Sequence, residues 1–182
     1  MTEVAITKRI LPPIEKGRIR LRLLELSDLS MTLSWRNQDR IRKWFIHSEV
    51  ISPKQHREWF EQYLQRDNDY VFIFEEIYSL QKPVGQISIY NINWKERQAE
   101  YGRLLIGEAE ARGKGIAKEA NHLLLDLAFT TLELDRVELE VFSDNGPAIA
   151  IYRACGFQEV YESNGLKKMV RVKKSPDLME VG

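Results

Sequence analysis

A glycine-rich turn between an extended run and a long amphipathic run most limits what this chain can fold into. Residues 100–106 are mostly apolar, residues 112–117 read Arg-Gly-Lys-Gly-Ile-Ala, and an amphipathic pattern continues to about Leu132. The glycines therefore lie where a strand ends and a helix begins. The first amides of a helix have no partner within it, and the helix dipole places partial positive charge there. Because Gly113 and Gly115 lack a Cβ, the backbone can present these amides to a phosphate at close range.

Two other phosphate-binding turns do not match this segment. A Walker loop needs four residues between its glycines and then Lys-Ser/Thr, whereas five residues separate Gly107 from Gly113 and a glycine stands at 115. A dinucleotide-binding turn needs a third glycine, and Lys118 occupies that position. A helix start that merely tolerates glycine remains the structural alternative.

The rest of the chain alternates between predicted strands and helices. Helices are expected from a Ser27 or Asp28 cap to about Asn37, from a Ser52-Pro53 capping box, and over 116–132 and 148–154. Residues 1–16 are interpreted as an irregular lead-in, and Ser163-Asn164-Gly165-Leu166 as a type I′ hairpin. Seven strands are predicted, at 18–23, 70–74, 84–90, 98–106, 137–141, 157–162 and 167–173. Short connections favour antiparallel pairs, but the helix before 137–141 makes that strand parallel to 98–106.

Composition limits the classes of partner. Lys+Arg and Asp+Glu both number 27, so no overall positive field favours nucleic acid. No apolar run approaches the roughly 18 residues of a membrane span, and the N-terminus lacks a signal-peptide core. The single cysteine, Cys155, excludes an internal disulfide. His47, His56 and His122 do not share metal-ligand spacing, so no metal is expected. A cytoplasmic protein without a nucleic-acid or membrane partner is predicted.

Two motifs in order resemble those of the GNAT acyl-CoA N-acyltransferases. Arg112, Gly115 and Ala117 match R/Q-x-x-G-x-G/A, and a second element, N-x-x-A-x-x-x-Y-x-x-x-G-F, is matched by Asn145, Ala148, Tyr152, Gly156 and Phe157. The resemblance covers about residues 17–174 and is greatest to the RimJ/RimL-type branch. It implies one α/β domain over 1–182 with the GNAT fold: a mixed, mostly antiparallel seven-stranded sheet, about four helices and a splayed parallel strand pair.

The resemblance also implies transfer of an acetyl group from acetyl-CoA, the cosubstrate, directly to a primary amine in a ternary complex. The coenzyme would contact the backbone of Leu104, Leu105 and Ile106, the turn residues Arg112, Gly113, Lys114, Gly115, Ile116 and Ala117, and Asn145 and Ala148. Tyr152 would protonate the leaving thiolate and Glu100 would deprotonate the amine, because an alkylammonium with a pKa of about 10.4 cannot attack a thioester. The alternatives are a packing tyrosine and an ordinary strand glutamate. Cys155 has no Cys-His pair in the sequence, which argues against a covalent intermediate.

The acceptor is expected to contact the segment after the first helix, at Trp35, Arg36, Asn37, Arg42, Trp44 and His47. Aromatic rings beside guanidinium groups suit a nucleotide base and its phosphates. This segment also loosely resembles the acetyltransferases of nucleotide-linked 4-amino sugars, through Trp35-Arg36-Asn37, Arg42-Lys43-Trp44, Glu49, Ile51-Ser52 and His56. A small or nucleotide-linked amine is therefore predicted, for a monomer or homodimer. A basic lid over a carboxylate or peptide, a protein N-terminus as acceptor, and a non-catalytic acyl-CoA-binding module remain alternatives.

Overall fold

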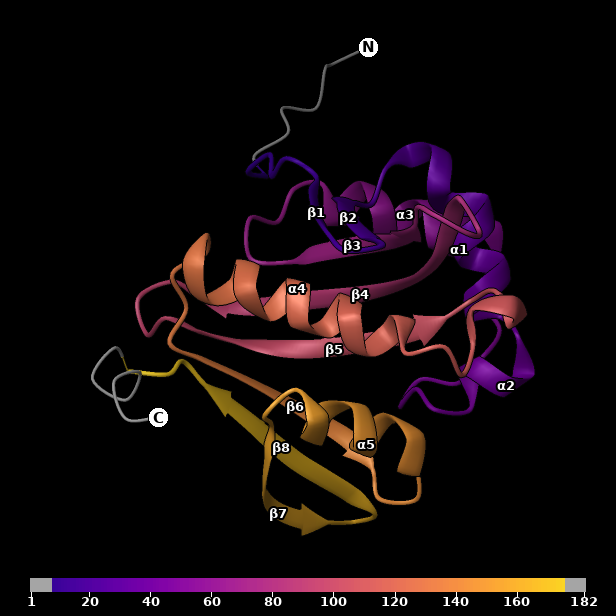
Figure 1. The fold of residues 1–182 in the computed structure, drawn as a ribbon. Helices are drawn as coiled ribbons and strands as arrows, with labels where there is room; N and C mark the ends of the chain where they lie inside the picture. Colours follow the sequence, from indigo (N-terminus) through magenta and orange to yellow (C-terminus); the bar gives the residue numbers. More distant parts are fainter. Residues whose placement is uncertain (1–7, 176–182) are drawn as a thin grey trace.

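A computed structural model describes residues 8–175. Eight strands form one sheet in the order β1-β2-β3-β4-β5-β6-β8-β7, in which only the β5–β6 pair is parallel (Figure 1). The strands are β1 (Ile14–Lys16), β2 (Ile19–Leu23), β3 (Tyr70–Glu76), β4 (Lys82–Asn93), β5 (Gln98–Ile106), β6 (Arg136–Phe142), β7 (Gln158–Ser163) and β8 (Leu166–Val172). The helices are α1 (Leu29–Arg36), α2 (Asp39–Arg42), α3 (Pro53–Tyr63), α4 (Ile116–Thr130) and α5 (Gly146–Ala154), with 3-10 turns η1 (Leu26–Asp28) and η2 (Ala109–Ala111).

The predicted fold class is confirmed, with two corrections in number. The lead-in contains β1, which pairs with β2 across a turn at Gly17, whose φ is +59°. Because glycine tolerates that positive φ, the chain can reverse tightly between β1 and β2. The second correction is α2, one short helical turn that follows α1. The type I′ hairpin is confirmed, since Asn164 and Gly165 both have positive φ.

The sheet separates two apolar clusters, one on each face. Alternating residues of the strands belong to different clusters: Phe72 joins the larger one with α4, whereas Val71 joins the smaller one with Trp35 of α1 and Phe60 of α3. Figure 1 shows α4 crossing one face of the sheet while α1 and α3 lie behind it. This alternation follows from the two-residue period of strand side chains.

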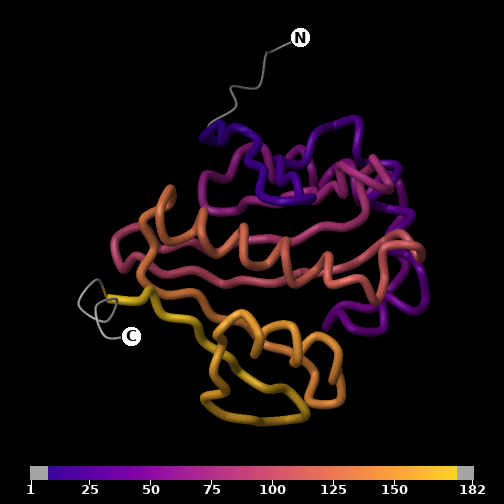
Figure 2. The backbone as a smooth tube through the Cα atoms, viewed as in Figure 1, coloured from indigo at the N-terminus to yellow at the C-terminus, as the bar shows by residue number. Residues whose placement is uncertain are grey.

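β5 is paired with β4 along its length but with β6 only at its start. It pairs with β6 only at residues 98–100, after which the two strands diverge (Figure 2). The divergence begins beside an irregularity in the β4–β5 ladder, where Gly102 has φ +135° and Arg103 has φ +50°. Such a bulge bends its strand and increases the local twist. The predicted splayed pair is therefore present, and it opens next to the bulge.

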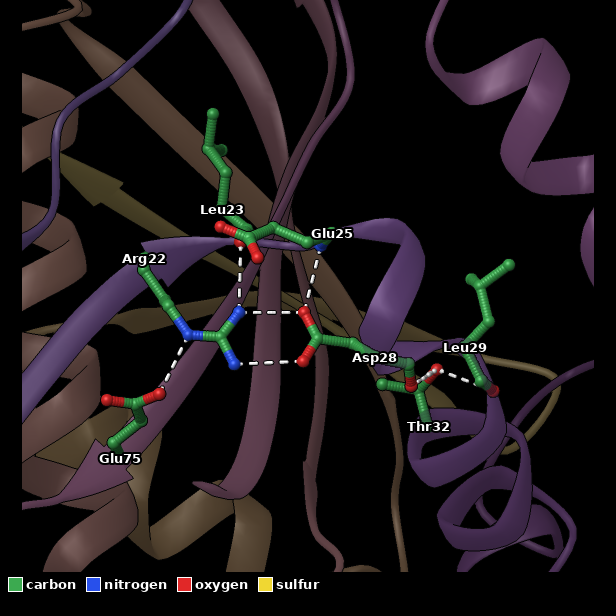
Figure 3. Close-up of polar contacts among 7 residues, drawn as sticks. All are labelled: Arg22, Leu23, Glu25, Asp28, Leu29, Thr32 and Glu75. Carbon is green, nitrogen blue, oxygen red and sulfur yellow. Dashed lines mark hydrogen bonds and ion pairs between the residues drawn. The ribbon is translucent and has the colours of Figure 1, made fainter. Parts of the chain in front are cut away.

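Capping contacts hold the helices on the smaller-cluster face. The Ser52–Gln55 capping box at the start of α3 is confirmed, with Gln55 N–H donating to Ser52 Oγ at 3.2 Å and Ser52 N–H donating to Gln55 Oε1 at 2.8 Å. Ahead of α1, the Arg22 guanidinium donates to both Asp28 carboxylate oxygens, at 2.7 and 2.8 Å, and to Glu75 at 2.7 Å (Figure 3). This network ties η1 to β2 and β3, and so positions the start of α1.

Within residues 8–175, none of the helices combines the length and apolar character needed to cross a bilayer. The cytoplasmic location stays a prediction.

Candidate active site

A cavity of about 1020 Å³ lies where β5 and β6 diverge. Its wall comes from five parts of the chain: the α1–α2 region with the segment after it, Tyr90 of β4 with residues 101–106 of β5, the glycine-rich turn, β6, and α5. Parallel strands that separate in this way leave the carboxyl ends of the strands open to a ligand. The two sequence motifs therefore face one cavity, although 29 residues separate Gly115 from Asn145.

The glycine-rich turn enters α4 in a conformation that suits glycine. Gly113 has φ +70°, and Gly115, the N-cap of α4, has φ +75°. A Cβ at Gly113 would meet no atom within 4 Å, so backbone conformation rather than crowding requires glycine there. Of the predicted turn residues, Arg112, Gly113, Gly115, Ile116 and Ala117 line the cavity, whereas Lys114 does not. The first amides of α4 therefore lie at the cavity wall, where an anion could accept their hydrogen bonds.

Arg18 supports this turn, a role that the sequence pattern does not indicate. Its guanidinium donates to the Lys114 carbonyl oxygen and forms an ion pair with Glu119 of α4 at 2.7 Å. Both contacts cross from the start of β2 to the start of α4. The only sequence signal was the alternating run of Arg18, Arg20 and Arg22, which does not specify which arginine contacts the turn.

The C-terminal part of β5 also lines the cavity. Leu104, Leu105 and Ile106 are all wall residues, as predicted for the segment beside the coenzyme arm. The β5–β6 register ends at Glu100, so this stretch lies beyond the last pair with β6. An extended ligand could therefore occupy the position of a neighbouring strand here.

Tyr152 of α5 reaches the same cavity from the other side of the gap. Asn145 caps α5 by accepting from the Ala148 amide at 3.3 Å, and Asn145, Ala148 and Tyr152 all line the wall. The Tyr152 side chain is buried, and its hydroxyl lies 3.8 Å from where a Cβ on Gly102 would stand. Burial, and then the nearby Tyr90, raise the pKa of Tyr152 above its usual value. The phenol therefore remains protonated and can donate a proton.

Cys155, one turn further along, does not have the properties of a nucleophile. The thiol is buried, and burial raises its pKa to about 11. Only the thiolate attacks carbonyl groups efficiently, so this cysteine is almost fully in the unreactive form at neutral pH.

Glu100 lies beside the cavity without lining it. The residue is exposed on β5, directly opposite Tyr90 on β4, and Tyr90 is the member of this pair that lines the wall. The Arg103 guanidinium stacks over the Tyr90 ring at 3.7 Å from its centroid and forms an ion pair with the buried Asp69 at 3.1 Å. Tyr90 and Arg103 were not singled out from the sequence, because their meeting depends on the β4–β5 register.

The predicted acceptor residues divide into two groups. Arg36, Trp44 and His47 line the cavity, and the structure adds Arg40, Ile41, Phe45 and Ile46 to that wall. Trp35, Asn37 and Arg42 do not line it. Trp35 is only 2% exposed and donates from Nε1 to Glu108 at 2.9 Å. The Asn37 side chain donates to the Ile51 carbonyl oxygen and accepts from the Ile51 amide. Arg42 donates to the Asp39 carboxylate and to the Ser48 carbonyl oxygen.

The acceptor end of the wall is cationic. In the described part of the chain, neither the Arg36 nor the Arg40 guanidinium has a carboxylate oxygen within 4.0 Å. Both donate to backbone carbonyls instead, and the buried Nη1 of Arg36 has no hydrogen-bond partner. Burial lowers the pKa of both arginines. The one carboxylate of the wall belongs to Glu140, on β6.

The fold and this cavity define a class of protein. A family model for the acetyltransferase (GNAT) domain matches residues 18–158, and the chain belongs to that family. It is therefore an acetyl-CoA-dependent N-acetyltransferase, as the motifs predicted.

Its relatives act on different amines, to judge from their names. A spermidine N(1)-acetyltransferase of Vibrio cholerae is 28% identical over 143 residues, covering 79% of this chain and 80% of the relative. A putative ribosomal N-acetyltransferase of Bacillus subtilis is 32% identical over 149 residues, covering 78% of each. A crystal structure of the Vibrio cholerae spermidine N-acetyltransferase with CoA and spermine superposes with a TM-score of 0.75 at 27% identity, covering 85% of this chain and 95% of that one.

Proposed function

We propose that this enzyme acetylates a small primary amine that carries an anionic group, of which a nucleotide-linked amine is one kind. The single observation that carries this proposal is the cationic acceptor wall, in which Arg36 and Arg40 lack carboxylate partners. Half-buried guanidinium groups such as these suit phosphate or carboxylate ligands, which they can bind through two parallel hydrogen bonds. Trp44 and Phe45 beside them could stack on a ring of the acceptor.

The coenzyme fits the other end of the cavity. The turn at 112–117 would hold its pyrophosphate through backbone amides, and residues 104–106 of β5 would bond its extended arm. Acetyl-CoA supplies the thioester. Tyr152 would donate its hydroxyl proton toward the sulfur, because burial keeps the phenol protonated and places it at the Gly102 bulge.

The spermidine acetyltransferases among the relatives suggest a different acceptor, a polyamine. A polycation is best bound by several carboxylates, and the cavity wall here carries one, Glu140, against the arginines Arg36, Arg40 and Arg112. The charge of the wall therefore favours an anionic acceptor over a polyamine. Acetylation of a protein N-terminus, and coenzyme binding without turnover, are the further alternatives that the experiment separates.

A series of amines with one chain length and different distal groups tests the acceptor. Thiol release from acetyl-CoA would be measured with diaminohexane, aminohexanol, aminohexanoate and aminohexyl phosphate, together with spermidine and a short peptide with a free N-terminus. We expect kcat/KM to be at least about tenfold higher for aminohexyl phosphate than for diaminohexane, because a hydrogen bond to a charged group contributes about 1.5–3 kcal/mol.

Arg36→Gln identifies the group that recognises the anion. It should remove most of the advantage of aminohexyl phosphate and leave kcat/KM for aminohexanol nearly unchanged, whereas the exposed Arg57→Gln should change neither. Preference for spermidine or for the peptide would contradict the anionic acceptor. Coenzyme binding by calorimetry without thiol release from any amine would instead favour a non-catalytic module.

Tyr152→Phe tests the proton donor. We expect kcat to fall on the order of 100-fold while acetyl-CoA binding measured by calorimetry changes little, because only the leaving sulfur needs that proton. A Tyr152→Phe enzyme with undiminished kcat would remove this residue from the mechanism.

A further inference from the structure

Glu100, the predicted base, does not line the cavity in this structure. An alkylammonium acceptor must lose a proton before its nitrogen can attack, and Glu100 was predicted to take that proton. Glu100, however, is exposed and does not line the cavity, whereas Tyr90 on the adjacent strand does. A side chain located between the cavity and Glu100 could therefore carry the proton from one to the other.

Tyr90 has the position that such a route requires. Tyr90 and Glu100 stand directly opposite each other in the β4–β5 register, so their side chains project from the same face of the sheet. Their neighbours Ile89 and Tyr101 point into the larger apolar cluster on the other face. Burial raises the pKa of Tyr90; the charge of Arg103 opposes this rise, and the nearby Glu100 carboxylate adds to it.

A charged clamp holds the Tyr90 ring in place. The Arg103 guanidinium covers the ring at 3.7 Å from its centroid, and Arg103 is itself anchored to Asp69, whose side chain is 6% exposed. Arg103 reaches this position through the left-handed backbone conformation of the β5 bulge, at φ +50°. That bulge also lies next to the hydroxyl of Tyr152, the predicted proton donor, so the clamp adjoins both predicted proton-transfer groups.

We propose that Tyr90 relays the proton of the acceptor ammonium to Glu100, an inference that rests on the proposed acetyl transfer. The ammonium N–H bond breaks and its proton passes to the Tyr90 oxygen. In the same step the Tyr90 O–H bond breaks and that proton passes to the Glu100 carboxylate. Tyr90 ends neutral, the amine ends neutral, and Glu100 ends as a carboxylic acid. Because Glu100 is exposed, it returns the proton to water.

The other charged groups near Tyr90 and Glu100 are paired with one another. Glu138 on β6 stands opposite Glu100, and its charge is balanced by Lys168 of β8 at 2.8 Å and by Arg136 at 3.3 Å. Burial opposes ionisation of Glu138, but these two cations outweigh it and hold its pKa below the usual value. Asp69 and Arg103 neutralise each other on the other side of Tyr90. Among the described residues, Glu100 and Glu140 are the carboxylates of this face without an ion-pair partner, and Glu100 is the one directly opposite Tyr90.

The test compares Tyr90→Phe, Glu100→Gln and the double variant by the pH dependence of kcat/KM for the best amine of the series. Near pH 7 each single variant should lose on the order of 100-fold, and the double variant should lose no more than either single one. The deficit should shrink as the pH rises toward the amine pKa of about 10.4, because free amine then becomes abundant. A weakly basic amine, neutral at pH 7, should show almost no deficit.

Exposed residues provide matched controls, since Tyr78→Phe and Glu96→Gln should retain wild-type kcat/KM at every pH. Thermal unfolding would verify that each variant is folded. A Tyr90→Phe deficit that persists at high pH and with the weakly basic amine would show a structural role and overturn the relay. Additive losses in the double variant, or no loss at all, would overturn it as well. Absence of wild-type turnover would instead contradict the proposed function, and the relay with it.

Discussion

His56 shows how the structure assigns a role to a residue that the sequence leaves open. Its Nε2 lies 3.0 Å from Thr32 Oγ1, and its ring stacks on Trp59 with centroids 5.4 Å apart. It does not line the cavity. Burial lowers the pKa of His56, so the imidazole is neutral in the folded enzyme. The residue links α3 to α1, the helix that carries Arg36 of the cavity wall, without lining the cavity itself.

The lowered pKa of His56 predicts a pH dependence of stability. The unfolded chain binds a proton at His56 below about pH 6.5 and the folded chain resists it, so the free energy of unfolding decreases as the pH falls from 7 toward 5. His56→Asn should lessen that slope in urea unfolding curves. Equal slopes for wild type and His56→Asn would contradict the assignment.

At the scale of elements, the contact between α1 and the end of β5 determines where the acceptor wall stands. A Cβ on Gly107 would lie 2.1 Å from ring atoms of Trp35, so the indole packs directly against the glycine backbone. The Trp35 Nε1–Glu108 hydrogen bond fixes the ring in that position, and Lys82 pairs with the same carboxylate at 3.0 Å. Trp35 therefore positions the wall without belonging to it.

Gly107→Ala should be strongly destabilising, because a rigid indole cannot move away from the new methyl group. We expect a loss of about 3 kcal/mol from overpacking and a Tm lower by roughly 6–12 °C. Gly146→Ala is the matched control, since a Cβ there meets nothing within 4 Å and the residue lies outside the cavity wall. A Tm for Gly107→Ala equal to that of the control would show that α1 does not pack here as described.

The molecule as a whole consists of two sheet halves that share one short seam. β6, β8 and β7 connect to β5 through three register pairs, at residues 98–100, and Figure 2 shows the two halves diverging beyond that point. The cavity wall draws residues from both halves, with Leu104 on one side and Tyr152 on the other. A ligand along this gap would therefore contact both halves at once.

Coenzyme binding should stabilise the whole fold. At a CoA concentration 100 times its Kd, the free energy of unfolding should increase by about 2.7 kcal/mol, which raises Tm by roughly 5–10 °C. Hydrogen exchange should slow at the amides of residues 104–106 and 116–117. Adenosine bisphosphate lacks the pantetheine arm and should protect only the second group. Protection of neither group by CoA would contradict the placement of the coenzyme.

Much of this arrangement could be predicted because several signals are local. The Ser52–Gln55 box, the Asn164–Gly165 hairpin and the helix start after Gly115 all depend on neighbours within a few residues, and all three are present. β1 was missed because a three-residue strand has too short a pattern to detect. The catalytic and binding roles of the predicted site residues stay predictions, as does the single-domain organisation.

The sequence by itself determined the order of the elements, the glycine-rich entry into α4 and the family, since periodicity, turn residues and motif spacing are properties of the chain alone. Only the tertiary structure decided which side chains meet. Tyr90 faces Glu100, Arg103 covers Tyr90 through the bulge, and Trp35 is buried while Trp44 lines the cavity. The physical reason is that cross-strand register and a single bulged residue determine which face of the sheet a side chain takes, and both depend on contacts between distant segments.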